Sequence, residues 1–199
     1  VLLVNGTSLH EEAWLFPALH WRFAPDVQAI ANSLRTGKLG EPGLFRLHDW
    51  ASPSSVQRDA SRIGAVDLAC WLFEKDPDSI YGALSSSGSK ACSLIHLGFP
   101  GGGMAMLDFT DTLPEGENYR SLSLIGSKGA AYADDHRNRN LLFAGGAPKA
   151  SPPNFEHAFI QPMLEDFIVS IREGRDSRRA TQNYRQALDI VSAAISTDS

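Results

Sequence analysis

Polar side chains that could carry chemistry alternate with aromatic ones near the start of the sequence. His20 and Arg22 alternate with Trp21 and Phe23, and this alternation predicts that both polar side chains share one face of a strand. An imidazole and a guanidinium on one face can bind a sugar or an acidic substrate. The other interpretation is a solvent-exposed pair or a structural ion pair. Both interpretations remain open from the sequence.

A single carboxylate interrupts the most apolar segment of the chain. Residues 63–73 read IGAVDLACWLF, which is apolar on every face of a helix and is typical of a buried one. Asp67 lies in its middle and needs a partner, because a buried unpaired charge is costly. Its position favours a structural hydrogen bond over an orienting role at a site. Arg62 can line the same cleft or form a surface salt bridge, and Trp50 can stack on a sugar ring or pack in the core.

Two further groups of residues do not favour a site. Asp134, Asp135 and His136 could ligate a metal, but the neighbouring arginines at 137 and 139 would repel a cation. No second ligand set follows at a diagnostic spacing, so a solvated loop without metal is the better prediction. Cys70 and Cys92 are expected to be buried small apolar residues, and no disulfide is expected.

Apolar periodicity predicts the elements that position these side chains. Helical spacing runs from Val27 to Leu34 after an N-cap at Asp26, and glycines at 37 and 40 end that helix. Residues 44–50 predict a strand and 63–73 a buried helix. From residue 79 the period changes to two, and short strands are predicted at 80–84, 92–99, 104–109, 122–125, 130–132 and 141–143.

The connections between these strands define the expected fold class. They are short and carry turn residues, which implies antiparallel pairing. Two helices then close the chain: one ends at Gly174, and the next has Thr181 as a candidate cap. We therefore expect an α+β fold, a largely antiparallel, open-faced β-sheet with helices packed on one face. The apolar run at residues 1–4 predicts a buried strand from something larger.

Composition excludes some classes of partner. The 199 residues are 43% hydrophobic and 21% charged, with a formal charge of −5, which is ordinary for a globular chain. No basic run suggests nucleic acid, and no apolar stretch is long enough to span a bilayer. No signal peptide is visible, so we expect a cytoplasmic protein.

The order of several short motifs resembles the C-terminal domain of the glucose–fructose oxidoreductase, inositol dehydrogenase and MocA (Gfo/Idh/MocA) family. The similarity runs from about residue 20 and depends on the order of the motifs, since none is specific alone. The matching segments are 20–25 (HWRFAP), 37–42 (GKLGEP), 66–72 (VDLACWL), the strand pair around 99–104, 125–129 (IGSKG) and the helix pair at 155–196.

The resemblance implies that a separate Rossmann domain binds NAD or NADP in the intact protein, and no cofactor is expected on this chain alone. Residues 1–18 would be a remnant or linker of that domain, and 19–199 a substrate-binding and oligomerisation domain. In the family, this domain supplies a proton-handling histidine and often an aspartate. Here those positions read Gly64 and Ala60, neither of which can move a proton. The catalytic residues are therefore unknown, and Arg58, Asp59 and Arg62 are the nearest replacements.

Three functions follow as hypotheses. The first is the substrate-binding and oligomerisation domain of an NAD(P)-dependent oxidoreductase acting on a sugar, polyol or related hydroxy compound, with His20, Arg22, Trp50, Arg62 and Asp67 as candidate substrate-binding residues. The second is a catalytically silent binding or scaffold module that keeps the fold without the chemistry. The third is a pure oligomerisation domain, because a sheet with helices on one face leaves the other face to be covered, which also predicts a homo-oligomer through that face.

Overall fold

The structure is a computed structural model, and it describes residues 2–3, 16–53, 58–87, 90–115, 117–134, 139–143, 149–151 and 158–196. Short elements come first: β1 (Leu2–Leu3), β2 (Phe16–Pro17), the 3₁₀ helix η1 (His20–Phe23) and α1 (Pro25–Arg35). Next come β3 (Pro42–Ala51), α2 (Arg58–Phe73), β4 (Ser79–Ser87), β5 (Lys90–Phe99), β6 (Gly103–Thr110) and β7 (Asn118–Gly126). The last are β8 (Ala130–Asp134), β9 (Arg139–Phe143), β10 (Lys149–Ser151), α3 (Ile160–Arg172) and α4 (Arg178–Ser196).

One sheet dominates the described part of the chain. Its eight strands lie in the order β10-β9-β8-β7-β3-β6-β5-β4, and all neighbours are antiparallel except β3 and β6, which are parallel. Strand β3 therefore lies between two strands that follow it in sequence. The prediction of antiparallel pairing between successive strands is confirmed for β4–β5, β5–β6, β7–β8 and β8–β9. It is wrong for β6 and β7, which β3 separates, and no sequence pattern predicted the parallel pair.

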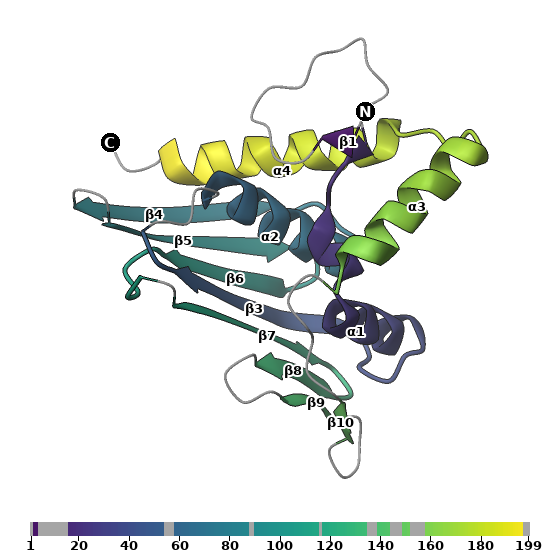
Figure 1. Cartoon of the computed structure of the whole chain (residues 1–199). Coiled ribbons are helices and arrows are strands. Elements are labelled where there is room, and N and C mark those ends of the chain that lie inside the picture. Colours follow the sequence, from purple (N-terminus) through teal and green to yellow (C-terminus); the bar gives the residue numbers. More distant parts are fainter. Residues whose placement is uncertain are drawn as a thin grey trace.

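The sheet has one face covered by helices and one open face (Figure 1). On the covered face, alternate residues of the central strands are fully buried, including Phe45, Leu47, Leu97, Leu107 and Leu124. Helices α2 and α4 contribute the other side of this core. The approach of α4 is so close that a Cβ at position 82 on β4 would lie 1.9 Å from the carbonyl oxygen of Ala194. The expected α+β fold with helices on one face is confirmed.

The open face carries large apolar side chains in contact with solvent. Tyr81, Met104, Ile125 and Tyr132 are 61%, 46%, 39% and 40% exposed. Met104 and Ile125 lie in one row of the sheet, on either side of β3. Tyr81 lies on β4, where it pairs with His96 of β5. The face is therefore mixed apolar and polar, and we use the name "open face" for it below.

The ends of α1 correct one expectation and confirm another. Ala24 is the N-cap, with Pro25 at the first helical position, so the prediction of Asp26 as the cap is wrong. Proline suits that position because it has no N–H to satisfy. Asp26 lies in the first turn, where its carboxylate accepts a hydrogen bond from the Val27 N–H. Gly37 adopts a φ of 70° just after the helix, which confirms it as the stop.

Four expectations from the sequence are wrong in the structure. Residues 20–23 form η1 and not a strand, because four alternating residues are too few to define a period and the Arg22 N–H closes a turn onto the Leu19 carbonyl. Thr181 lies inside α4 and does not cap it; its hydroxyl donates to the Ser177 carbonyl. Cys92 is exposed on the open face and Cys70 is half-buried, so neither is fully buried, and both are free thiols.

The first elements of the chain form a separate small sheet. Strands β1 and β2 pair in parallel, Leu2 with Phe16 and Leu3 with Pro17, and they lie outside the eight-stranded sheet (Figure 1). The predicted strand at residues 1–4 is thus present at 2–3. None of the helices in the described part of the chain has both the length and the apolar composition that crossing a bilayer requires.

Candidate functional site

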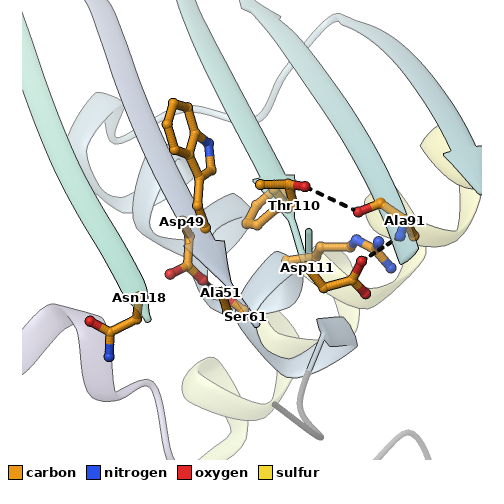
Figure 2. A pocket seen from close by; sticks show the side chains of 10 residues that line it. Asp49, Ala51, Ser61, Ala91, Thr110, Asp111 and Asn118 are labelled. Atoms are coloured by element: carbon orange, nitrogen blue, oxygen red, sulfur yellow. Dashed lines mark hydrogen bonds between the residues drawn. The ribbon is translucent and has the colours of Figure 1, made fainter. Parts of the chain in front are cut away.

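The parallel strands β3 and β6 create a pocket with polar and apolar lining at the edge of the sheet where these two strands end. Their carboxyl ends meet there, and β5 and β7 begin at the same edge. Helix α2 starts above this edge and completes the pocket, which has a volume of about 270 Å³ (Figure 2). Its lining residues are Asp49, Trp50, Ala51, Ser61, Arg62, Ala91, Phe109, Thr110, Asp111 and Asn118. We call this cavity the edge pocket.

A buried cation forms part of the wall of the edge pocket. The Arg62 side chain is only 8% exposed. Its Nε donates to Ser93 Oγ at 2.9 Å and its Nη1 to Asp59 Oδ1 at 3.0 Å. These two bonds fix the plane of the guanidinium, so it offers donors in a set direction. Arg62 therefore lines the edge pocket and also forms an ion pair with Asp59, whose side chain is 61% exposed, while its role in substrate binding stays a prediction.

Two carboxylates face the same cavity as hydrogen-bond acceptors. Asp49 accepts a hydrogen bond from the Ser61 hydroxyl of α2. Asp111 accepts one from the Ala91 backbone N–H, while the Thr110 hydroxyl lies 3.4 Å from the Ala91 carbonyl (Figure 2). Fixed acceptors, one fixed cation and two aromatic walls suit a small ligand with several hydroxyl groups, because each hydroxyl both donates and accepts.

Trp50 forms an aromatic wall of the edge pocket, and residues on the open face fix the orientation of its ring. Its Nε1 donates to Asp108 Oδ2 at 3.0 Å, and the other oxygen of Asp108 contacts Nδ1 of His48. The Tyr119 ring centroid lies 5.0 Å from that of Trp50. Trp50 is half-buried and lies outside the buried core, so the stacking role predicted for it remains available and the core-packing role is wrong.

Arg22 and Asp67 form a structural ion pair away from the edge pocket. Arg22 Nε and Nη2 donate to the two oxygens of Asp67 at 2.7 and 2.5 Å, and the Arg22 guanidinium carbon lies 5.5 Å from the ring centroid of Trp71. Burial raises the pKa of Asp67, and the hydrogen bonds from Arg22 act against that shift. The pair joins η1 to α2, which confirms the structural interpretation for both residues.

His20 lies on η1 beside aromatic rings and not in the edge pocket. Its ring centroid is 5.1 Å from that of Phe159 and 5.9 Å from that of Trp21. Burial lowers the pKa of His20, and the Ala18 carbonyl, 3.4 Å from Nδ1, partly opposes this. A lowered pKa keeps the imidazole neutral at pH 7. His20 and Arg22 thus belong to a different cluster from Trp50 and Arg62.

Gly64 makes room for an indole ring. A Cβ at position 64 would lie 2.9 Å from Trp21 Cδ1 and 3.0 Å from Trp21 Nε1. Trp21 is 4% exposed, and its Nε1 has no hydrogen-bond partner among the described residues. The Arg120 guanidinium carbon lies 5.2 Å from the ring centroid of Trp21. Any side chain at position 64 would therefore require Trp21 to move.

The structure brings together only part of the predicted site. Trp50 and Arg62 share the edge pocket, while His20, Arg22 and Asp67 lie elsewhere. Sequence reasoning missed the other polar lining residues, namely Asp49, Ser61, Thr110, Asp111 and Asn118. The available signal was a polar residue at the end of a predicted strand, as in Asp49 and Asp111, but the pairing that joins those ends was not visible.

Two sequence features that could indicate a metal or a dinucleotide site are not supported in the described residues. Within them, no group of three histidine, cysteine, aspartate or glutamate side chains could hold a metal ion; Asp135 and His136 lie outside the described residues. The glycine-rich segment at 100–103 is the turn between β5 and β6, with φ of 93° at Gly101 and 94° at Gly102. A dinucleotide cradle requires such a turn to lead into a helix, so these residues do not fit one.

Solved structures of oxidoreductases share this fold. A levoglucosan dehydrogenase in complex with NADH and L-sorbose superposes with a TM-score of 0.72 at 14% identity, over 93% of this chain and 64% of that one. The UDP-N-acetylglucosamine 3-dehydrogenase of Acidithiobacillus ferrooxidans gives 0.71 at 18%, over 89% and 60%. An aldose–aldose oxidoreductase from Caulobacter crescentus complexed with glycerol gives 0.68 at 18%, over 88% and 60%.

At these identities the likeness establishes the fold, which is that of the larger part of these oxidoreductases. The chain spans about three fifths of the length of the structures that it matches. No family model matches the sequence, and no curated protein matches it.

Replacing Arg22 with methionine should destabilise the protein by about 3–5 kcal/mol, because it leaves Asp67 buried without its cation. The raised pKa of Asp67 means that the folded state holds the proton more tightly than the unfolded state. Stability is then lost as pH rises above the ordinary aspartate range near about 4. Without Arg22 this loss extends to higher pH, so the deficit in denaturant unfolding should be larger at pH 8 than at pH 5.

A matched control for Arg22→Met is Arg175→Met. Arg175 also forms ion pairs, with Asp166 and Glu173, but its side chain is 48% exposed. Solvent screens such pairs, so this variant should follow wild type at every pH. Parallel pH profiles for the Arg22 variant and wild type would show that Asp67 does not depend on Arg22.

Replacing Gly64 with alanine tests the contact with Trp21. In an ordinary helix interior this change stabilises by about 1 kcal/mol, but here the new Cβ would contact the indole, and overpacking costs about 1–3 kcal/mol. We expect net destabilisation in wild type and a neutral or stabilising effect in the Trp21→Leu background. A double-mutant cycle from denaturant unfolding measures the coupling; additive changes would rule the contact out.

Proposed function

We propose that the chain is the substrate-binding domain of a cytoplasmic Gfo/Idh/MocA-type oxidoreductase that acts on a sugar, polyol or related hydroxy compound. The observation that carries the proposal is the fold that it shares with sugar-acting oxidoreductases over most of its length. NAD or NADP would be held by a separate domain to which residues 1–18 connect, and residues 19–199 would bind the substrate.

The edge pocket supports this proposal through its chemistry. Asp49 and Asp111 would accept hydrogen bonds from substrate hydroxyls, and Arg62 and Asn118 would donate to substrate oxygens. Trp50 would stack on the apolar face of a sugar ring. Because several of these groups are fixed by bonds within the protein, the pocket would bind its ligand without reorganising.

A second candidate function, the catalytically silent binding module, is favoured by a specific observation. Position 64, where the resemblance would have a histidine, has no space for a side chain while Trp21 stays where it is. Position 60 is an alanine. This domain would then bind its ligand without handling the proton, unless a group outside α2 does so. Turnover of a substrate separates the two candidates.

The test uses the protein as its gene encodes it, with sugars and polyols as substrates and NAD or NADP as the oxidant. We expect reduced cofactor to accumulate with at least one substrate. In Asn118→Ala the loss of one donor in the edge pocket should raise KM about fivefold, which corresponds to one hydrogen bond, and leave the affinity for the cofactor unchanged. Steady-state kinetics and calorimetry measure these quantities.

The control for Asn118→Ala is Asn32→Ala, a change of the same type at an exposed position on α1 outside the edge pocket, and it should leave KM unchanged. If the protein binds neither NAD(H) nor NADP(H), the oxidoreductase proposal is lost. If it binds the cofactor and the sugar but turns over none of the substrates, the silent module is the better description.

The open face would serve self-association under the same proposal. Contiguous exposed apolar residues on a sheet face are typical of an interface, and Met104 and Ile125 lie on the central strands β6 and β7, on either side of the start of β3. His48 and Asp108 add polar groups on the same face. A homo-oligomer through the open face would bury this surface.

We expect sedimentation equilibrium to show a dimer or larger oligomer for wild type and a shift toward monomer for Met104→Glu, because a carboxylate would be buried in the interface. Ile80→Glu is the matched control: Ile80 is 40% exposed, close to the 46% of Met104, but belongs to the helix-covered side of β4. A wild type that stays monomeric at high concentration excludes this role for the open face.

A further inference from the structure

Trp50 borders a second cavity besides the edge pocket. This cavity lies on the open face, where residues of β3, β4, β5 and β6 line a space of about 580 Å³. Trp50, Phe109 and Thr110 line both cavities. The half-buried indole of Trp50 is therefore part of a wall that the two cavities share. We call the second one the open-face cavity.

One hydrogen bond fixes the direction in which the Trp50 ring faces. An indole has a single hydrogen-bond donor and no acceptor, and in Trp50 this donor, Nε1, bonds to Oδ2 of Asp108 at 3.0 Å. The rings of Tyr119 and His48 also contact the indole, with centroids 5.0 and 5.7 Å away. Aromatic contacts of this kind are compatible with several ring orientations. The bond to Asp108 therefore decides which orientation Trp50 adopts.

The carboxylate of Asp108 is itself held, because it bridges two side chains of one strand. His48 and Trp50 are two residues apart on β3, so they share the open face, and Asp108 of β6 lies directly opposite His48. Oδ1 of Asp108 contacts Nδ1 of His48, while Oδ2 accepts the hydrogen bond from Trp50. With a contact at each oxygen, the carboxylate presents Oδ2 to the indole in a set direction.

These contacts of Asp108 contribute little to the stability of the sheet. The backbone ladder already joins β3 to β6 along its length, from the Leu44–Met104 pair to the Trp50–Thr110 pair. The side chains of Asp108 and His48 are 31% and 38% exposed, and solvent weakens ion pairs at such exposure. The effect of Asp108 is therefore on the direction of the indole more than on the strength of the fold.

We propose that Asp108 is a positioning residue, which holds the Trp50 ring against the edge pocket and keeps it out of the open-face cavity. This inference rests on the proposed function, in which Trp50 stacks on the substrate. Side chains move between separate rotamers, and the open-face cavity provides space for a second rotamer of Trp50. Without the bond to Asp108, the apparent affinity for substrate falls by the fraction of molecules in which the ring is in place.

The first test measures steady-state kinetics of the protein as its gene encodes it, with the sugar or polyol that wild type turns over. Asp108→Ala should raise KM about tenfold, which corresponds to a ring that is in place about one tenth of the time. The kcat should not change, because a bound substrate keeps the ring in position. Asp108→Asn retains an oxygen acceptor and should restore most of the affinity. Neither variant should change the affinity for NADH or the midpoint of denaturant unfolding.

Trp50→Phe separates positioning of the indole from any other effect of Asp108, since it keeps an aromatic ring and removes the Nε1 donor. In this background Asp108→Ala should leave KM within about twofold of the value for Trp50→Phe alone, because no bond is left to lose. An equal rise in KM in both backgrounds would show that Asp108 acts without Trp50 and would overturn the inference.

A second measurement needs no substrate: acrylamide quenching of Trp50 fluorescence, taken as the difference between each protein and its Trp50→Phe version. Quenching should increase in Asp108→Ala and not in Asp108→Asn, because a released ring turns into the open-face cavity. The matched control is Asp166→Ala, which breaks an exposed ion pair with Arg175 on α3, outside both cavities. It should change neither KM nor quenching.

The outcomes separate this inference from the proposed function. An active protein in which Asp108→Ala leaves KM and quenching as in wild type would overturn the inference and leave the proposed function standing. A protein that binds neither NAD(H) nor NADP(H) would remove the proposed function, and quenching alone would then decide whether Asp108 holds Trp50 in place.

Discussion

The parallel pairing of β3 with β6 is the constraint on which the rest of the structure depends. Because β3 lies between β6 and β7, the chain must travel from its end to the far edge of the sheet before returning as β6. Helix α2 makes that crossing over the covered face. The carboxyl ends of β3 and β6 then meet below the start of α2, and this alone brings Asp49 and Asp111 close to Ser61 and Arg62.

A buried crossover helix imposes further requirements on its neighbours. Asp67 lies inside the core at 2% exposure and needs a cation. Arg22 supplies it from η1, with two hydrogen bonds in the forked geometry that a guanidinium provides. Holding η1 against α2 brings Trp21 onto the helix, and Gly64 is the residue that allows it. The Arg22–Asp67 pair and the Trp21–Gly64 contact are thus parts of one packing arrangement.

The sequence predicted the helices and strands whose pattern of apolar and polar residues depends on burial alone. Alternation in residues 80–143 predicted the strands β4–β9, because one face of that sheet is buried and the other is not. Residues 63–73 predicted a buried helix for the same reason. The periodicity of apolar residues does not show that β3 lies between later strands. The lining residues of the edge pocket come from α2 and four strands, so their proximity could not be predicted from the sequence. At residues 20–23 the alternation was too short to separate a strand from a 3₁₀ turn.

The contrast between the edge pocket and position 64 bears on the choice between the two candidate functions. A buried guanidinium costs stability unless its bonds compensate, and replacing such a group with apolar residues is often neutral or stabilising. A scaffold that binds no ligand would gain nothing from Arg62 at the wall of a cavity, whereas both candidate functions include ligand binding and would use it. The Trp21–Gly64 contact, in contrast, is close packing that stabilises the fold. It leaves no room at position 64 for a side chain that could transfer a proton. Under the proposed function, ligand binding and proton handling would be separable in this domain, because the fixed polar side chains line the edge pocket and position 64 has no room for a proton-transferring group.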